Sequence, residues 1–310
     1  MVIRLLELVV VGKKWQVQNM SIVSMNEILQ PAFQERYGVG AFNIVDDLTM
    51  SAILDAAEQI SAPVILQVSV KTVKVLSAKL VQRMFEEMAS HHSIPTTLHL
   101  DHCPDVTMIK TCLDAGWNSV LFDASNLSYE ENLRQTKEVV KMARACGAAV
   151  EGELEAVRGV EDGVGSDDQG AIVALDKCVE FLDQTRIDSF APAIGTAHGL
   201  YKATPKINFD RVREIVVAYP VPIVLHGGTG LSNEIFQKLI AAGCAKVNIS
   251  TMLKITFCDA YRNYLNRKPE EHDPLKLRAS VHGEIVTMAK GFMQVFGSAG
   301  KAAPAGVRAR

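Results

Sequence analysis

The sequence has few of the features that mark nucleic-acid-binding, secreted or membrane-spanning proteins. Its 32 Lys and Arg residues are balanced by 35 Asp and Glu residues, and the net charge of -3 provides no basic field for a nucleic acid. The 6 cysteines include no CxxC pair, which favours reduced thiols in an intracellular protein over a disulfide framework. No apolar run reaches the roughly 20 residues that span a bilayer. We therefore expect a cytoplasmic protein without nucleic-acid or membrane partners.

The composition that remains is that of a globular protein. Hydrophobic side chains make up 48% of the 310 residues and charged ones 22%, which excludes disordered, collagen-like and coiled-coil chains. At about 150 residues per domain the length suggests roughly two domains, but an α/β barrel uses the whole length as one. The domain count therefore has to come from the pattern of the sequence.

β-rich segments alternate with amphipathic helical segments from residue 38 onward. The segments that predict strands are 39–44, 63–69, 95–100, 119–123, 148–154, 189–194, 221–225 and 245–249. Strands that alternate with helices pair in parallel, and apolar runs such as PVILQVS and VPIVL are typical of strands covered on both faces. Eight such units predict a closed (β/α)8 TIM barrel. The alternative is an open doubly wound sheet, but no GxGxxG follows the first strand, which excludes its commonest dinucleotide-binding version.

The barrel domain is predicted over residues 20–301. Beyond the last strand, periodic apolar residues predict additional helices over 252–266 and 274–296. The Gly- and Ala-rich end of the chain, residues 302–310, is expected to be a mobile tail.

Residues 1–19 are interpreted as a non-native or flexible N-terminal extension. Their short apolar run is interrupted by Glu7 and is followed by Gly12 and two lysines rather than by a cleavage site, so it is not a signal peptide. A capped amphipathic segment begins at Met20, which we take as the natural start. The alternative is an extra hairpin or helix at the base of the barrel.

Three histidines fall at the C-terminal ends of predicted strands, where TIM barrels build their active sites. They are His102 after the third strand, His198 after the sixth and His226 after the seventh. Three neutral imidazoles with an open fourth position form a catalytic zinc site, in which the metal acts as a Lewis acid toward a carbonyl. A single histidine here would more often be a hydrogen-bonded structural residue, but three together favour the metal.

Glycines at the same strand ends indicate a site for an anion. Gly199, Gly227 and Gly228 let the backbone approach a ligand, and the loops after strands seven and eight commonly bind phosphate in barrels. Lys202, four residues after His198, adds a positive charge. The alternative is that these glycines only shape short loops and that Lys202 is a solvated surface lysine.

Two carboxylates are candidates for proton transfer. Asp101 neighbours His102 and would lie within reach of a metal-bound substrate, or else serve as a hydrogen-bond partner of a histidine ligand. Glu161 lies in a long loop over residues 155–175, and loops of this length are often active-site lids. A solvated acidic loop is the alternative. Together the features indicate a metal-dependent barrel enzyme that acts on a small phosphorylated carbonyl compound.

A series of motifs contains these residues in a fixed order. The motifs are AFNIV (41–45), PVILQVS (63–69), LHLDHC (98–103), VEGEL (150–154), AIGTAHGLYK (193–202), VLHGGTG (224–230), KVNIST (246–251) and FGSAGKA (296–302). Their order resembles that of the class II, metal-dependent ketose-bisphosphate aldolases, which include fructose-1,6-bisphosphate and tagatose-1,6-bisphosphate aldolases. The resemblance runs from about residue 21 to residue 301, and LHLDH with GTAHGLYK is most similar to the tagatose-type branch.

The resemblance implies reversible cleavage of a ketose 1,6-bisphosphate to dihydroxyacetone phosphate and glyceraldehyde 3-phosphate through a zinc-stabilised enediolate. The implied zinc ligands are His102, His198 and His226, with Asp123 and Glu153 available to a displaced or second metal position. Asp101 would exchange the proton of the C4 hydroxyl, Glu161 would handle the proton at the enediolate carbon, and Asn248 would steady the enediolate. The substrate and its phosphate, often with Na⁺ or K⁺, would be held by Asn43, Ser69, Gly199, Lys202, Gly227, Gly228, Thr229, Ser250 and Thr251.

A Schiff-base aldolase would instead need a desolvated lysine inside the barrel. Lys246 is the candidate on a predicted strand, but it lies near the start of that strand, at the end away from the site.

The chain departs from the family's usual pattern at two places. Glu153-Leu154-Glu155 stands where ELG is usual, so a carboxylate replaces a loop glycine beside the long loop. Ser250 occupies a position that is aspartate in typical fructose-bisphosphate enzymes and small in tagatose-type relatives, which favours the tagatose type without settling the substrate. Lys254 either meets a distal phosphate or is a solvated helix lysine.

Other kinds of function stay open at this point. A noncatalytic barrel that serves as a partner subunit is one alternative, because the loop sequence is altered, although no ligand histidine is lost. A metal-dependent barrel hydrolase fits less well, since His99 and His102 are spaced three apart rather than as HxH. An aldolase for a different phosphorylated sugar acid or aldehyde is a further alternative. The family also implies a homodimer or homotetramer.

Overall fold

The protein is described by a computed structural model. It covers residues 8–11, 14–17, 21–156, 159–161, 164–166, 172–199, 201 and 205–302. Side chains are described within these ranges from residue 21 onward, apart from those of residues 160, 161 and 164–166.

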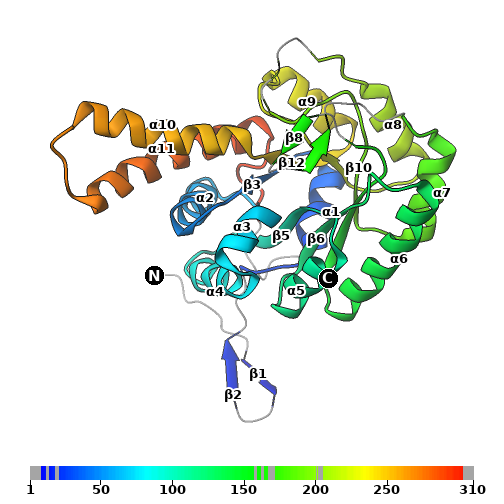
Figure 1. Ribbon diagram of the computed structural model, residues 1–310, viewed down its shortest axis with the longest axis horizontal. Coiled ribbons are helices and arrows are strands. Elements are labelled where there is room, and N and C mark those ends of the chain that lie inside the picture. Colours follow the sequence, from blue (N-terminus) through cyan, green and yellow to red (C-terminus); the bar gives the residue numbers. More distant parts are fainter. Residues whose placement is uncertain are drawn as a thin grey trace.

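A closed barrel of parallel strands forms the centre of the molecule, in the order β10-β11-β12-β3-β4-β5-β6-β7 (Figure 1). Its strands are β3 (Val39–Asn43), β4 (Val64–Ser69), β5 (Thr96–Cys103), β6 (Ser119–Asp123), β7 (Ala149–Glu153), β10 (Ser189–Ala191), β11 (Ile223–Leu225) and β12 (Cys244–Ile249). Each overlaps one of the eight predicted strands, and the predicted TIM barrel is confirmed. β5 runs beyond its predicted end at residue 100, to Cys103.

Helices follow the strands and cover the outside of the barrel (Figure 1). They are α2 (Asp47–Gln59), α3 (Val70–Leu76), α4 (Ala78–Ala89), α5 (Val106–Asp114), α6 (Tyr129–Ala145), α7 (Leu175–Thr185), α8 (Phe209–Ala218) and α9 (Asn233–Ala242). Side-chain caps fix where several of them begin: Asp46 accepts from the Thr49 backbone N–H, and Ser232 accepts from that of Ile235. The caps place the helix N-termini at the rim where the strands end.

The opposite end of the barrel is closed by α1 (Met25–Glu35). Its apolar face, including Met25, Ile28 and Leu29, packs against residues near the strand starts such as Val39 and Ala245. These side chains are almost fully removed from water, so α1 covers the N-terminal end of the barrel with apolar core.

Two further helices follow the last strand, as predicted. They are α10 (Thr251–Arg267) and α11 (Pro274–Val295), which form an antiparallel pair that extends away from the barrel, with α11 against α2 (Figure 1). Among the helices of the described residues, none combines the length and the apolar character needed to cross a membrane.

Two short hairpins lie outside the barrel. β1 (Leu8–Val11) pairs with β2 (Lys14–Val17) within the predicted N-terminal extension. β8 (Gly159–Glu161) pairs with β9 (Val164–Ser166) inside the segment predicted as one long loop, so the prediction of an unbroken loop is wrong there. The sequence carries the signal for this hairpin, because Asp-Gly stands between the two valine-containing segments. The predicted tail lies outside the described residues from residue 303 onward.

Candidate active site

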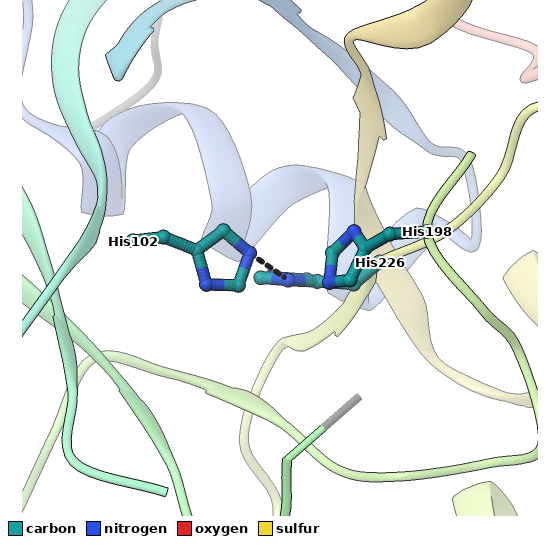
Figure 2. A group of neighbouring side chains, drawn as sticks. All are labelled: His102, His198 and His226. Atoms are coloured by element: carbon teal, nitrogen blue, oxygen red, sulfur yellow. Dashed lines mark hydrogen bonds between the residues drawn. The ribbon is translucent and has the colours of Figure 1, made fainter. Parts of the chain in front are cut away.

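The three predicted histidine ligands converge above the C-terminal end of the barrel (Figure 2). One ring nitrogen of each lies within 4.8 Å of the others. The ring centroids are 4.6 Å apart for His102 and His226, 5.0 Å for His102 and His198, and 5.9 Å for His198 and His226. Strand β5 and the segments that follow β10 and β11 thus bring three imidazoles to one point.

A break in strand regularity allows Asp101 and His102 to serve the same site. Successive side chains of a strand point to opposite faces, so neighbouring residues normally cannot both face it. The pairing of β5 with β6 shifts register between Leu100 and Cys103, and His102 has a φ of 39°. This left-handed backbone is rare outside glycine and is a mark of functional sites. The bulge is why β5 can supply both residues.

Carboxylates fix how two of the rings are oriented. The Nδ1 of His102 donates to Asp123 Oδ2 at 2.7 Å, and the Nε2 of His226 donates to Glu151 Oε1 at 2.8 Å. The remaining nitrogens, His102 Nε2 and His226 Nδ1, face each other 2.9 Å apart (Figure 2). Because the other nitrogen of each ring donates to a carboxylate, these two nitrogens need either a shared proton or a metal cation beside them. Orientation of ligand imidazoles by carboxylates is the usual arrangement in metal sites.

The electrostatics around His102 also favour positive charge. Burial by itself would lower the pKa of His102, but the charges of Asp101, Asp123 and Glu153 and the hydrogen bond to Asp123 raise that pKa well above its usual value. Burial lowers the pKa of His226, which keeps its ring neutral, as metal binding requires. His102, Asp123 and Glu153 form a second group whose ligand atoms lie within 4.8 Å of one another.

A buried charged cluster lies beneath the histidines, inside the barrel. Glu151 Oε2 is 2.8 Å from Lys246 Nζ and 3.5 Å from His99 Nε2, and all three side chains are almost fully buried. Burial would raise the pKa of Glu151, but Lys246 and the two neighbouring histidines hold it below its usual range. Lys246 Nζ is engaged by the Glu151 carboxylate, which does not suit a Schiff-base nucleophile. Instead Lys246 compensates the carboxylate that orients His226.

Asp101 is held by a chain of amides. Its Oδ2 accepts from Asn43 Nδ2 at 2.7 Å, and Asn43 Oδ1 accepts from Gln67 Nε2 at 2.5 Å. Asp101 is buried, and its Oδ1 has no hydrogen-bond partner among the described residues. One carboxylate oxygen is therefore fixed by the protein and the other is left to accept a proton from a ligand.

The loops that carry His198 and His226 are tied to each other. Tyr201 donates its hydroxyl to the Gly227 carbonyl at 2.6 Å and accepts from the Ala197 backbone N–H at 3.0 Å. Gly227 has a φ of 68°, and a Cβ there would lie 2.4 Å from the Ala197 carbonyl oxygen. Only glycine allows this close approach, so the two ligand loops meet at Gly227.

The remaining predicted substrate residues lie around the same rim. Asn248 is the last residue but one of β12, and both polar atoms of its buried side chain, like Ser250 Oγ, have no hydrogen-bond partner among the described residues. Thr251 begins α10, and a Cβ at Gly199 would meet nothing within 4 Å. The others that the structure places at strand ends or in the loops directly after them are Ser69, Gly228 and Thr229. Buried polar groups without protein partners are expected where a ligand binds.

Two predicted residues are not tested by the structure. Lys202 lies outside the described residues. Glu161 ends β8, but its side chain also lies outside them.

Sequence reasoning missed Glu151, Gln67 and Tyr201. Glu151 and Gln67 stand two residues before Glu153 and Ser69, and period-2 alternation along a strand could have placed them on the same face, one layer deeper. Tyr201 sits within the motif that carries His198, but no local signal showed that its hydroxyl would join two loops.

Comparison with known proteins settles which family has this arrangement. The sequence profile described as fructose-bisphosphate aldolase class-II matches residues 23–301. The chain belongs to the class II fructose-bisphosphate aldolase family. As a class II aldolase it is a carbon–carbon lyase, and the family assignment made from the motifs is confirmed.

Relatives of this class II aldolase match over almost its whole length. The fructose-bisphosphate aldolase of Geobacillus stearothermophilus is 40% identical over 290 residues, which is 92% of this chain and 100% of the relative. The sulfofructosephosphate aldolase of Alkalicoccus urumqiensis is 34% identical over 284 residues, covering 91% and 99%. The crystal structure of the YdjI aldolase from Escherichia coli K12 superimposes with a TM-score of 0.79 at 31% identity, covering 91% of this chain and 100% of that one.

Proposed function

We propose that this class II aldolase binds one catalytic zinc ion per chain and reversibly cleaves a ketose 1,6-bisphosphate, of the tagatose or fructose type, to dihydroxyacetone phosphate and glyceraldehyde 3-phosphate. The observation that carries the proposal is the pair of basic nitrogens on His102 and His226 that face each other at 2.9 Å while carboxylates hold their other nitrogens. His198 completes the donor set. This set fits zinc, which prefers imidazole ligands and keeps an open position in catalytic sites. Asp123 and Glu153 would serve a displaced or second metal position.

When bound, zinc supplies Lewis acidity toward the carbonyl of the dihydroxyacetone phosphate portion. The chain's own residues handle the protons and orient the substrate. Asp101 accepts the C4 hydroxyl proton on Oδ1 while Asn43 holds Oδ2 in place. Asn248 donates from Nδ2 to the enediolate of dihydroxyacetone phosphate, and Glu161 exchanges the proton at the enediolate carbon. Breaking C3–C4 then leaves the electron pair on a fragment whose charge the site is built to stabilise.

The phosphate of the dihydroxyacetone portion is assigned to the loops after β10, β11 and β12. The residues proposed to hold it or the adjacent substrate atoms are Gly199, Lys202, Gly227, Gly228, Thr229, Ser250 and Thr251, with Asn43 and Ser69 nearby and Na⁺ or K⁺ as a counter-ion. Their backbone N–H groups and hydroxyls suit an anion, because glycines in loops that lead into helices leave donors exposed.

Metal analysis combined with a coupled assay tests the proposal. Release of dihydroxyacetone phosphate from fructose and tagatose 1,6-bisphosphates is measured in parallel, with and without a chelator. About one zinc per chain and chelator-sensitive release are expected. Metal-free protein without turnover would overturn the proposal and favour a noncatalytic partner subunit.

A second substrate class is suggested by the sulfofructosephosphate aldolase among the relatives. Ser250 in place of aspartate supports a departure from the fructose-bisphosphate type, and sulfofructose phosphate is therefore included as a third substrate in the assay. A homodimer or homotetramer is also proposed, and the mass of the enzyme in solution, measured by light scattering, tests it.

A further inference from the structure

Glu155 is buried two residues beyond the end of β7 and holds three segments together. Its Oε1 accepts from the Val173 backbone N–H at 3.0 Å, and its Oε2 accepts from the Ala193 backbone N–H at 3.0 Å. Arg211, on α8, donates from Nη2 to Oε1. The carboxylate thus joins the end of the β7–α7 connection, the segment after β10 and the first turns of α8.

Arg211 completes the cluster from the other side. Its Nη2 also donates to the Val173 carbonyl at 2.9 Å and to Cys178 Sγ at 3.4 Å. Both backbone polar groups of Val173 are therefore taken by the ion pair. The side chains of Arg211 and Glu155 are 7% and 0% exposed, so each charge depends on the other for compensation.

The segments that meet at this pair form the base of the loop that carries His198. Ala193 stands five residues before His198, and the next carbonyl, Ile194, accepts from the Asn208 backbone N–H at 2.9 Å. Asn208 caps α8, the helix of Arg211. The two ends of the loop that carries His198 are thus held together by one backbone hydrogen bond and by the Glu155–Arg211 pair.

A second contact joins the β7–α7 connection to His198 itself. Gly159, at the start of β8, has a φ of 97°, and a Cβ there would lie 2.8 Å from the His198 carbonyl oxygen and 3.0 Å from its nitrogen. The backbone of β8 therefore lies directly on the backbone of His198. A shift of the β7–α7 connection, which contains β8, would therefore also displace the backbone of His198.

We propose that Glu155 and Arg211 are positioning residues that set the place of His198 by fixing the base of its loop against the β7–α7 connection. This inference rests on the proposed function, in which His198 binds zinc. Both side chains are buried, so they act through the loop after β10, which carries His198 together with the proposed phosphate-binding residues Gly199 and Lys202. The expected change in the loops after β11 and β12 is small.

The test uses the zinc-loaded enzyme and the variants Glu155→Gln, Arg211→Met and Glu155→Leu/Arg211→Met. Asn118→Ala is the matched control, because Asn118 also ties segments together by hydrogen bonds, to Thr97, Leu98 and Val23, but at the other end of the barrel. Hydrogen exchange of peptides 155–175 and 193–208 is followed by mass spectrometry, and zinc loss to an excess of chelator is timed.

In the three variants, exchange in both peptides and zinc loss are expected to rise together by about 10-fold, the lower end of the effect of partners that orient metal ligands. The Asn118 control should leave all three rates unchanged even where it lowers the melting temperature. kcat should fall and KM should rise, because the loop that carries His198 also carries Gly199 and Lys202, which are proposed to hold the phosphate. Should a single variant fail to fold, the double variant removes both buried charges and keeps the test available.

The inference is overturned if the variants lose zinc at the wild-type rate, or if the two peptides do not respond together. Failure of the proposed function looks different, because wild-type enzyme would then hold no zinc and release no dihydroxyacetone phosphate. Hydrogen exchange still decides in that case whether the Glu155–Arg211 pair fixes the two segments.

Discussion

Replacing Lys246 by methionine would leave the Glu151 carboxylate buried without its cation. The two groups are 2.8 Å apart, and their side chains are 0% and 1% exposed, so water cannot replace the lost charge. Removing one partner of such a pair costs about 3–5 kcal/mol of unfolding free energy. At about 2 °C per kcal/mol for a chain of this size, the melting temperature should fall by about 6–10 °C.

Thermal and urea unfolding of Lys246→Met measure the effect. Lys110→Met is the matched control: Lys110 is 2.7 Å from Asp114, but both side chains are 61% exposed, so the loss should be under about 1 kcal/mol. Adding Glu151→Leu to Lys246→Met should recover most of the stability, since no buried charge remains, but His226 then loses the carboxylate that orients it, and zinc should be held less tightly. The reasoning is refuted if Lys246→Met and Lys110→Met destabilise the protein equally.

The remaining predictions concern the proton acceptor, a surface carboxylate and a loop glycine. Asp101→Asn should lower kcat at least about 100-fold with zinc content unchanged, measured by the coupled assay and metal analysis; near wild-type turnover would contradict the assigned role. The pKa of Glu58 is lowered because hydrogen bonds from Ser93 outweigh its partial burial, so its stabilising effect should be present above about pH 4.3 and be lost on acidification below it. Urea midpoints of wild type and Glu58→Gln should therefore differ at pH 7 and converge near pH 3; a constant difference would count against the assignment. Gly227→Ala places a Cβ 2.4 Å from the Ala197 carbonyl oxygen, and zinc content should fall, whereas Gly283→Ala, with nothing within 4 Å, serves as the tolerated control.

The sequence allowed the barrel to be predicted because its strands are short apolar runs separated by periodic helices. Each strand is a local pattern, and closure follows from the number of units. Because His102, His198 and His226 stand at or after the ends of predicted strands, their meeting at one rim could be predicted without knowing any distance. What could be predicted is therefore what local periodicity and fold topology determine.

The rest depends on contacts between residues distant in the sequence. The bulge at His102 arises from the pairing of β5 with β6, and no neighbouring residue in the sequence predicts a positive φ there. The sequence predicts Lys246 near the start of its strand, and it lies in the first half of β12. Its ion pair with Glu151, on the non-neighbouring strand β7, could be found only from the three-dimensional structure. Glu155 could be recognised as a departure from the family pattern, but its partner Arg211 is 56 residues away.

Position 102 has to meet two requirements that favour different residues: a positive φ and the ligation of a metal. The backbone conformation is best accepted by glycine, with asparagine, aspartate and histidine next, whereas the proposed zinc site needs histidine at this position. As long as the metal is needed, selection maintains a residue that the backbone disfavours. In a descendant of this chain that no longer used the metal, mutation to glycine would relieve strain and would no longer be removed. The residue at position 102 therefore reports, across the descendants of such a chain, whether selection for metal binding is still acting.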